Sequence, residues 1–169
     1  MQAGSRARAG LVGLSLLLLA GCGDGVGEKG FQKQYAVARD ALERGLYVRA
    51  SEVYSELIPK SGPLAPRLKL EYAHTLLRAG HFTKASAHAE ALAQSQHDTA
   101  RSAALAVHGT AEHELGLAAL AQGNRPAGKQ HFQAARTSLN EMLAEDPLLD
   151  PLGSMKGRRD SISKRLKTL

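Results

Sequence analysis

Residues 115–135 read LGLAALAQGNRPAGKQHFQAA, and this stretch decides the fold. It contains two helical patterns that meet at a turn marked by Gly123 and Pro126. Gly116 in the first pattern faces Gly128 in the second, and Phe132 is the one large side chain near them. Helices approach closely only where side chains are small. We therefore expect two closely packed helices, with Phe132 filling the space left between them.

The same arrangement of small and aromatic residues occurs twice earlier, around Gly45 and around Gly80. An aromatic residue follows each glycine by two positions (Tyr47 and Phe82), with alanines on both sides. Gly45 and Gly80 are 35 residues apart, and Gly80 and Gly123 are 43 apart. The pattern resembles the tetratricopeptide repeat family, whose unit is a helix–turn–helix of about 34 residues. Over residues 31–140, this resemblance implies a short right-handed α-solenoid of about three units, a scaffold that binds other proteins.

The composition favours helices throughout. Aromatic residues make up only 4% of the chain, and Ala and Leu dominate the apolar residues, which leaves little for a sheet core. We therefore expect an all-α fold. Periodicity and the breaks at glycine and proline predict helices from 28 or 31 to 44 and over 47–58, 65–79, 82–94, 98–122 and 126–144, with Asp98 as an N-cap. The helix at 98–122 is longer than a repeat needs and absorbs the extra spacing before Gly123.

The N-terminus carries a targeting segment. Arg6 and Arg8 precede an apolar stretch at residues 9–20, which is too short to span a bilayer as a stable helix. The motif LAGC at residues 19–22 resembles the lipobox of bacterial lipoprotein signal peptides. The resemblance implies cleavage before Cys22, diacylglycerol on its sulfur and acylation of the new amino group. An ordinary signal peptide with a chance cysteine, or a short membrane anchor, is the alternative.

These features predict four parts of the chain. Residues 1–21 are the signal peptide, residues 22–30 are the lipidated Cys22 and a flexible glycine-rich tether, residues 31–146 are the repeat domain, and residues 147–169 are a loop followed by a basic C-terminal helix or tail. Gly23, not Asp, follows Cys22. Because Asp at that position is the signal that retains such lipoproteins in the inner membrane, we expect the outer membrane, facing the periplasm.

The positive charge is concentrated near the C-terminus. After Cys22 the chain has 20 basic and 16 acidic residues, a net charge of +4. Residues 156–167 contribute six basic residues and one acidic residue, so the remainder is close to neutral. The charge therefore gives no evidence that the body of the protein binds nucleic acid. The basic residues of this tail are Lys156, Arg158, Arg159, Lys164, Arg165 and Lys167.

The tail also carries an apolar stripe, because Ile162, Leu166 and Leu169 are spaced by four and three residues. Three conformations of the tail are compatible with this stripe. A capping helix would cover the apolar face of the last repeat. A basic amphipathic helix would contact anionic lipid headgroups or cell-wall polymer. A disordered tail is the third.

No motif in the sequence indicates catalysis or a bound metal. The chain has seven histidines, but His81 falls in a turn between His74 and His88, and His108 and His113 are badly spaced for two ligands on one helix. There is no phosphate-binding loop and no Gly-x-Ser-x-Gly elbow. We therefore expect no enzyme activity, no cofactor, no metal and no small-molecule substrate.

In the family that the repeats resemble, the first helix of each unit lines the concave face and contacts a peptide of the partner. Matching the units by their turn glycines carries this role onto seven residues that mix apolar and cationic side chains, which suits a segment with some acidic character. The alternative is that these residues only solvate one side of the array. They are Tyr35, Arg39, Leu70, His74, Arg78, His113 and Leu117.

The sequence thus predicts a membrane-anchored lipoprotein that acts as an interaction or assembly scaffold for an envelope complex. The resemblance implies pilus, secretion or outer-membrane assembly as the kind of process. The alternative is a protein that binds the cell wall or an anionic envelope surface through its basic tail.

Overall fold

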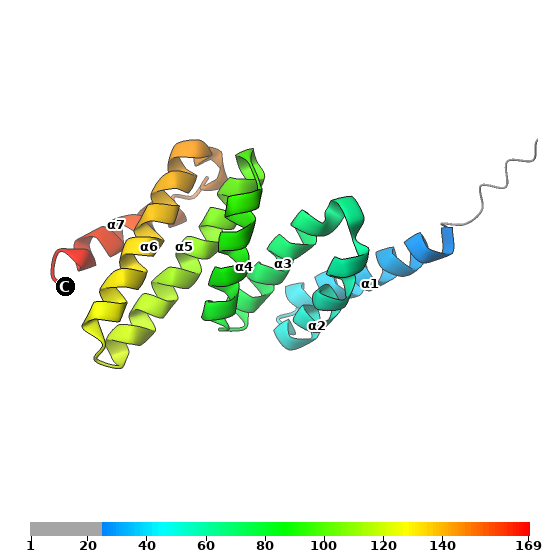
Figure 1. Cartoon of the computed structure of the whole chain (residues 1–169), viewed down its shortest axis with the longest axis horizontal. Helices are drawn as coiled ribbons and strands as arrows, with labels where there is room; N and C mark the ends of the chain where they lie inside the picture. The colour runs from blue at the N-terminus through cyan, green and yellow to red at the C-terminus, as the bar shows by residue number, and fades with distance from the viewer. Residues whose placement is uncertain (1–24) are drawn as a thin grey trace, which may run out of the picture.

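The structure is a computed structural model that describes residues 25–169, and every regular element in that part of the chain is helical. The all-α prediction is therefore confirmed. Figure 1 shows the helices side by side in a row, from α1 and α2 at one end to α7 at the other. The helices are α1 (Gly25–Glu43), α2 (Tyr47–Leu57), α3 (Ala65–Arg78), α4 (Phe82–Ser95), α5 (Asp98–Ala121), α6 (Arg125–Glu145) and α7 (Ser154–Leu166), with short 3-10 turns η1 (Ile58–Lys60), η2 (Gly62–Leu64) and η3 (Pro147–Leu149).

Three tight turns between paired helices share one geometry. Gly45, Gly80 and Gly123 have φ values of +75°, +79° and +75°, a region that glycine enters without steric cost. After each glycine the next N–H bonds back five residues, as in His81 N to Leu76 O at 2.9 Å. This satisfies carbonyl groups that the end of a helix leaves free. The turn glycines predicted from the sequence thus end α1, α3 and α5.

The pair α5–α6 is closely packed, as residues 115–135 predicted. A Cβ atom added at Gly116 would lie 2.8 Å from Cε1 of Phe132, and one at Gly128 would lie 3.3 Å from the carbonyl oxygen of Gly116. Phe132 itself is fully buried. Gly109 makes a further close approach that the sequence argument did not identify, since a Cβ there would lie 2.8 Å from Cγ of Leu139. Glycine therefore sets the distance between these two helices at three points.

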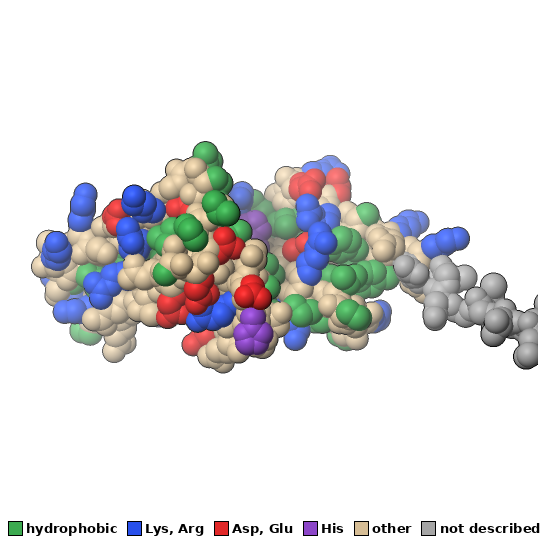
Figure 2. Space-filling view, turned by 90° about the horizontal axis from the view of Figure 1, so that it is seen from above, with side chains coloured by type: hydrophobic (Ala, Val, Ile, Leu, Met, Phe, Trp, Pro, Cys, Tyr) green, Lys and Arg blue, Asp and Glu red, His purple; other side chains and the backbone are tan. Residues whose placement is uncertain are grey.

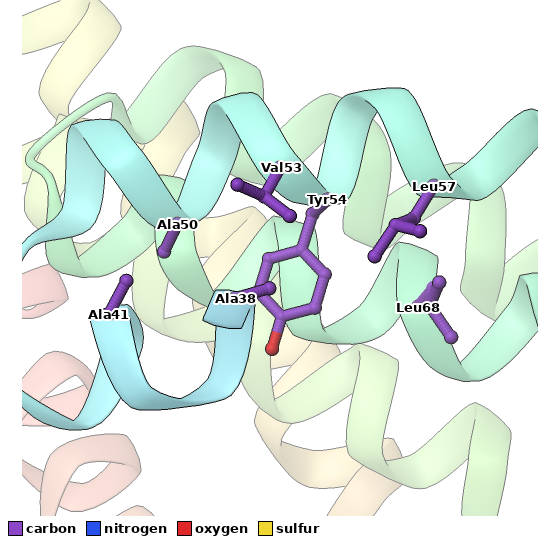
Figure 3. Packing of buried hydrophobic residues seen from close by; sticks show 7 residues of the cluster. All are labelled: Ala38, Ala41, Ala50, Val53, Tyr54, Leu57 and Leu68. Atoms are coloured by element: carbon purple, nitrogen blue, oxygen red, sulfur yellow. The ribbon is translucent and has the colours of Figure 1, made fainter. Parts of the chain in front are cut away.

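The first two helices and the start of α3 enclose a separate small core. Figure 3 shows Tyr54 reaching from α2 toward Ala38 of α1, with Leu57 and Leu68 beside it. All four side chains are essentially fully buried. Three helices therefore share one core at this end of the row.

The C-terminal segment forms a helix that packs on the rest of the protein. Ile162 of α7 is buried against Phe132 and Leu139 of α6, and Leu166 and Leu169 pack beside it. The apolar stripe of the tail therefore contributes to the core.

Two details differ from the sequence prediction. α1 begins at Gly25, inside the stretch expected to be a flexible tether at 22–30. Glycine lowers helix propensity by about 1 kcal/mol per residue without forbidding the helix, and these turns continue a helix that is held by Phe31 and Tyr35. Asp98 is the first residue of α5 and His97 occupies the N-cap position, where no side chain caps the helix.

None of the helices in residues 25–169 combines the length and apolar character needed to cross a membrane. The predicted signal peptide and Cys22 lie outside the described residues.

Candidate functional site

Glu71 of α3 holds the first three helices together. Its Oε1 accepts hydrogen bonds from Tyr35 at 2.8 Å, from Arg67 at 3.2 Å and from Arg39 at 3.4 Å. Its Oε2 accepts a bond from Tyr54 at 2.8 Å. The donors come from α1, α2 and α3, so one carboxylate fixes the relative positions of three helices. Ionised acceptors make stronger bonds than neutral ones, which suits this role.

Burial and the hydrogen bond to Glu71 both change the pKa of the two tyrosine hydroxyls. Burial is the larger cause and Glu71 the next, and together they raise the pKa of Tyr35 and of Tyr54 above the ordinary value. Both hydroxyls therefore stay protonated and act as donors. Arg67 adds a cation–π contact, with its guanidinium 5.8 Å from the centre of the Tyr35 ring.

A cavity of about 360 Å³ opens beside this carboxylate, between α1, the start of α2, and α3. It brings together three of the seven predicted groove residues: Arg39, His74 and Arg78. The full lining is Arg39, Leu42, Glu43, Tyr47, Glu71, His74 and Arg78.

Within residues 25–169, no carboxylate pairs with Arg78, one of the two arginines of this cavity. Its Nη2 donates to the Tyr47 hydroxyl at 2.8 Å, and its guanidinium lies 5.4 Å from the centre of that ring. Arg39, in contrast, pairs with both Glu43 and Glu71. Tyr47 thus orients Arg78 without neutralising it, so its positive charge is available to a ligand.

His74 lies between these groups and is half-buried. Burial, and then repulsion by Arg78, lowers its pKa below the ordinary value. The neutral ring therefore dominates at neutral pH, and the charge of the cavity comes from its arginines and carboxylates.

Leu70 lines a different hollow at the opposite end of α3. This hollow, of about 510 Å³, lies between the start of α3, the end of α4 and the start of α5. Its surface is mostly apolar. Besides Leu70 it is lined by Pro63, Leu64, Pro66, Arg67, Leu92, Gln96, Thr99, Ala100 and Ala103.

His113 and Leu117 do not line either hollow, because α7 lies against them. Arg158 of α7 donates to Nδ1 of His113 at 2.9 Å and to Glu114 at 3.0 Å. Leu117 packs into the cluster that contains Ile162. Burial is the main cause that lowers the pKa of His113. The cavity of the predicted groove is therefore built from α1, α2 and α3, without residues from α5.

Sequence reasoning missed Glu71, Glu43 and Tyr47. An acidic residue on a helix gives no signal by itself, because most are solvated. Tyr47 did carry a signal, since an aromatic residue follows the turn glycine by two positions in the first two units. That signal indicates the position of a turn and not a binding role.

A second buried carboxylate, Glu112 on α5, links α4 and α6. Ser86 Oγ donates to it at 2.6 Å, and Nδ1 of His131 lies 2.8 Å from its other oxygen. The serine proton thus points at the carboxylate and not at an imidazole, so the three residues do not form a nucleophile and base. Within residues 25–169, no three His, Cys, Asp or Glu side chains gather as metal ligands do.

The six basic residues of the tail divide into two groups. Each of the three arginines contacts another side chain: Arg158 pairs with Glu114 of α5, Arg159 pairs with the next residue, Asp160, and the guanidinium of the exposed Arg165 lies 5.5 Å from the centre of the Phe132 ring. The three lysines are exposed. They are Lys156, Lys164 and Lys167.

Comparisons of the chain with protein-family models, with curated proteins and with solved structures find no match.

Proposed function

We propose that this protein is a lipoprotein of the bacterial envelope, anchored through Cys22, whose helices form a short tetratricopeptide-like solenoid that holds a segment of a partner protein. Three helix–turn–helix pairs with matching turn glycines support the repeat assignment. The motif LAGC after a short apolar stretch supports the anchor.

The observation that carries the binding proposal is the cavity between α1 and α3, in which Arg78 is oriented by its hydrogen bond to the Tyr47 hydroxyl. Arg78 is exposed, so a carboxylate supplied by a ligand can reach it, and charge-assisted hydrogen bonds are about twice as strong as neutral ones. Leu42 and the Tyr47 ring provide apolar surface next to it. The partner segment therefore carries an acidic side chain near an apolar one.

Site-specific cross-linking tests this proposal. A photoreactive residue at position 74 stands in the cavity, whereas one at position 87 stands on the exposed side of α4. Irradiation of intact cells should give a discrete adduct from position 74 and none from position 87. The same pattern of adducts from both positions would rule out the cavity as the contact site.

A pair of charge variants identifies the chemistry. Arg78→Gln with Arg39→Gln removes both cations of the cavity and should abolish the adduct. The matched control is Arg44→Gln with Lys60→Gln, which removes two exposed cations outside the cavity. Persistence of the adduct in the first variant would contradict recognition of an acidic segment.

The anchor is tested separately. Cys22→Ser removes the thiol that accepts the lipid, so the fatty acyl groups that mass spectrometry detects on the unsubstituted protein should be absent from the variant. An unsubstituted protein that carries no fatty acyl groups, or a Cys22→Ser variant that keeps them, would instead favour an ordinary signal peptide or membrane anchor.

A further inference from the structure

The loop between α6 and α7 exposes two leucines almost completely. Leu148 is 86% exposed and Leu152 is 93% exposed, the highest values among the exposed large apolar residues of the described chain. Two prolines, at 147 and 151, restrict the backbone of this loop, and three backbone hydrogen bonds close it. An ordered loop thus exposes both leucines to water, and there their side chains do not stabilise the fold.

The acidic residues of the same loop turn inward. Asp150 accepts hydrogen bonds from the backbone N–H groups of Met155 and Lys156, at 3.0 Å and 2.9 Å, and so caps α7. Asp146 accepts a bond from Thr99 at 2.9 Å. Both carboxylates of the loop are thus hydrogen-bonded within the protein, whereas both leucines protrude into water.

Helix α7 starts at Ser154, two residues after Leu152, and its solvent-exposed face carries lysines. Since Ile162 is buried, the helical period puts Lys156, Lys164 and Lys167 on the opposite side, where all three are exposed. The one acid on that side, Asp160, pairs with Arg159 at 2.7 Å. Figure 2 shows Lys and Arg side chains gathered at this end of the molecule.

We propose that the Leu148–Leu152 loop and the lysine face of α7 dock on an anionic phospholipid bilayer, with the leucines entering the interface and the lysines binding headgroups. Protruding apolar side chains beside exposed lysines match a surface whose headgroups are negative and whose interior is apolar. This inference does not rest on the lipidation of Cys22 or on the cavity between α1 and α3. The proposed membrane contact lies at the end of the row of helices opposite α1. The docking helix, α7, is about 20 Å long.

The test uses the full-length chain with Cys22→Ser, so that one introduced thiol carries the label. Gly157→Cys puts a fluorophore on the solvent face of α7, where an added Cβ meets nothing within 4 Å. Ala87→Cys puts it on α4 as the control. Vesicles contain nitroxide-labelled lipid as the quencher and are made of phosphatidylcholine alone or with phosphatidylglycerol.

We expect quenching of the label at position 157 only with phosphatidylglycerol, and little quenching at position 87. Each lysine contributes about fivefold at an anionic surface, so Lys156→Gln, Lys164→Gln and Lys167→Gln together should lower the ratio of docked to undocked protein by about 100-fold. Leu148→Asp with Leu152→Asp should also abolish quenching, with an unchanged melting curve because both side chains are exposed.

Equal quenching at positions 87 and 157, or no quenching at 157 with either lipid, overturns the proposal. Quenching that survives the leucine variant overturns insertion of the loop. A purified chain that ignores vesicles but is cross-linked in cells through position 152 to another protein would assign the surface to a protein partner instead.

Discussion

Replacing Gly116 by alanine tests the packing on which the whole fold argument depends. The new Cβ atom would lie 2.8 Å from Cε1 and 2.9 Å from Cδ1 of Phe132. The ring cannot move aside easily, because Phe132 is fully buried and Arg165 of α7 lies over it. The alanine therefore forces the helices apart or distorts the ring.

Two effects of opposite sign decide the size of the change. Overpacking a well-packed core costs about 1–3 kcal/mol. Alanine in place of glycine inside a helix stabilises by about 1 kcal/mol. We therefore expect Gly116→Ala to lower the free energy of unfolding by about 0–2 kcal/mol. Gly157→Ala in α7 is the matched control, because no atom lies within 4 Å of its added Cβ. It should stabilise by about 0.5–1 kcal/mol.

Urea unfolding followed by circular dichroism measures both variants, and a Phe132→Leu background completes a double-mutant cycle. Leucine lacks the ring atoms that the new Cβ meets, so the loss caused by Gly116→Ala should disappear there, with a coupling energy of about 1–3 kcal/mol. A Gly116→Ala protein as stabilised as Gly157→Ala, with coupling near zero, would refute close packing at this point.

Three further results are expected. Glu71→Gln leaves the buried hydroxyl of Tyr54 without its carboxylate partner and should lower the free energy of unfolding by about 1–3 kcal/mol in urea. Asn124→Ala removes the side chain that caps α6 by accepting from Ala127 N, and should lower the thermal stability by about 1 kcal/mol. Burial would raise the pKa of Asp150, but backbone hydrogen bonds outweigh burial and lower that pKa in the folded protein. The ionised Asp150 therefore stabilises the fold at a pH above its unfolded-state pKa, and this stabilisation is lost as the pH falls through its folded-state pKa. Asp150→Asn should reduce the pH dependence of the free energy of unfolding between these two pKa values, as measured by unfolding at a series of acid pH values.

Much of the fold could be predicted because its signals are local. A glycine with positive φ ends a helix whatever surrounds it, so Gly45, Gly80 and Gly123 could be identified without knowledge of tertiary contacts. Pro126 marks the first turn of α6 for the same reason. The start of α1 could not be predicted as well, because a glycine-rich stretch joined to a helix can extend it or remain a tether.

The candidate site was harder to predict because it depends on contacts between distant residues. Aligning repeats by their turns assigned Arg39, His74 and Arg78 to one face, and these residues do line one cavity. The same alignment also assigned His113 and Leu117, which α7 covers. The apolar stripe of the tail agreed with a capping helix, with a basic amphipathic helix and with a disordered tail, because a stripe alone does not determine which surface it covers. Glu71 gave no signal at all, since four donors converge on it only in three dimensions.

Different interactions hold the helices together in the α5–α6 pair and in the α1–α3 pair. At the α5–α6 pair, glycines bring the helices into direct contact around an apolar ring, so that interface needs no ligand to be complete. At the α1–α3 pair, a single carboxylate accepts from four donors, and the cavity beside it holds Arg78, with which no carboxylate of the described part of the chain pairs. An acidic ligand bound in this cavity would add its interactions to that arginine. The contacts of Gly116, Gly128 and Phe132 therefore involve none of the residues that line this cavity, so substitutions of Arg39 or Arg78 should leave the packed C-terminal pair intact.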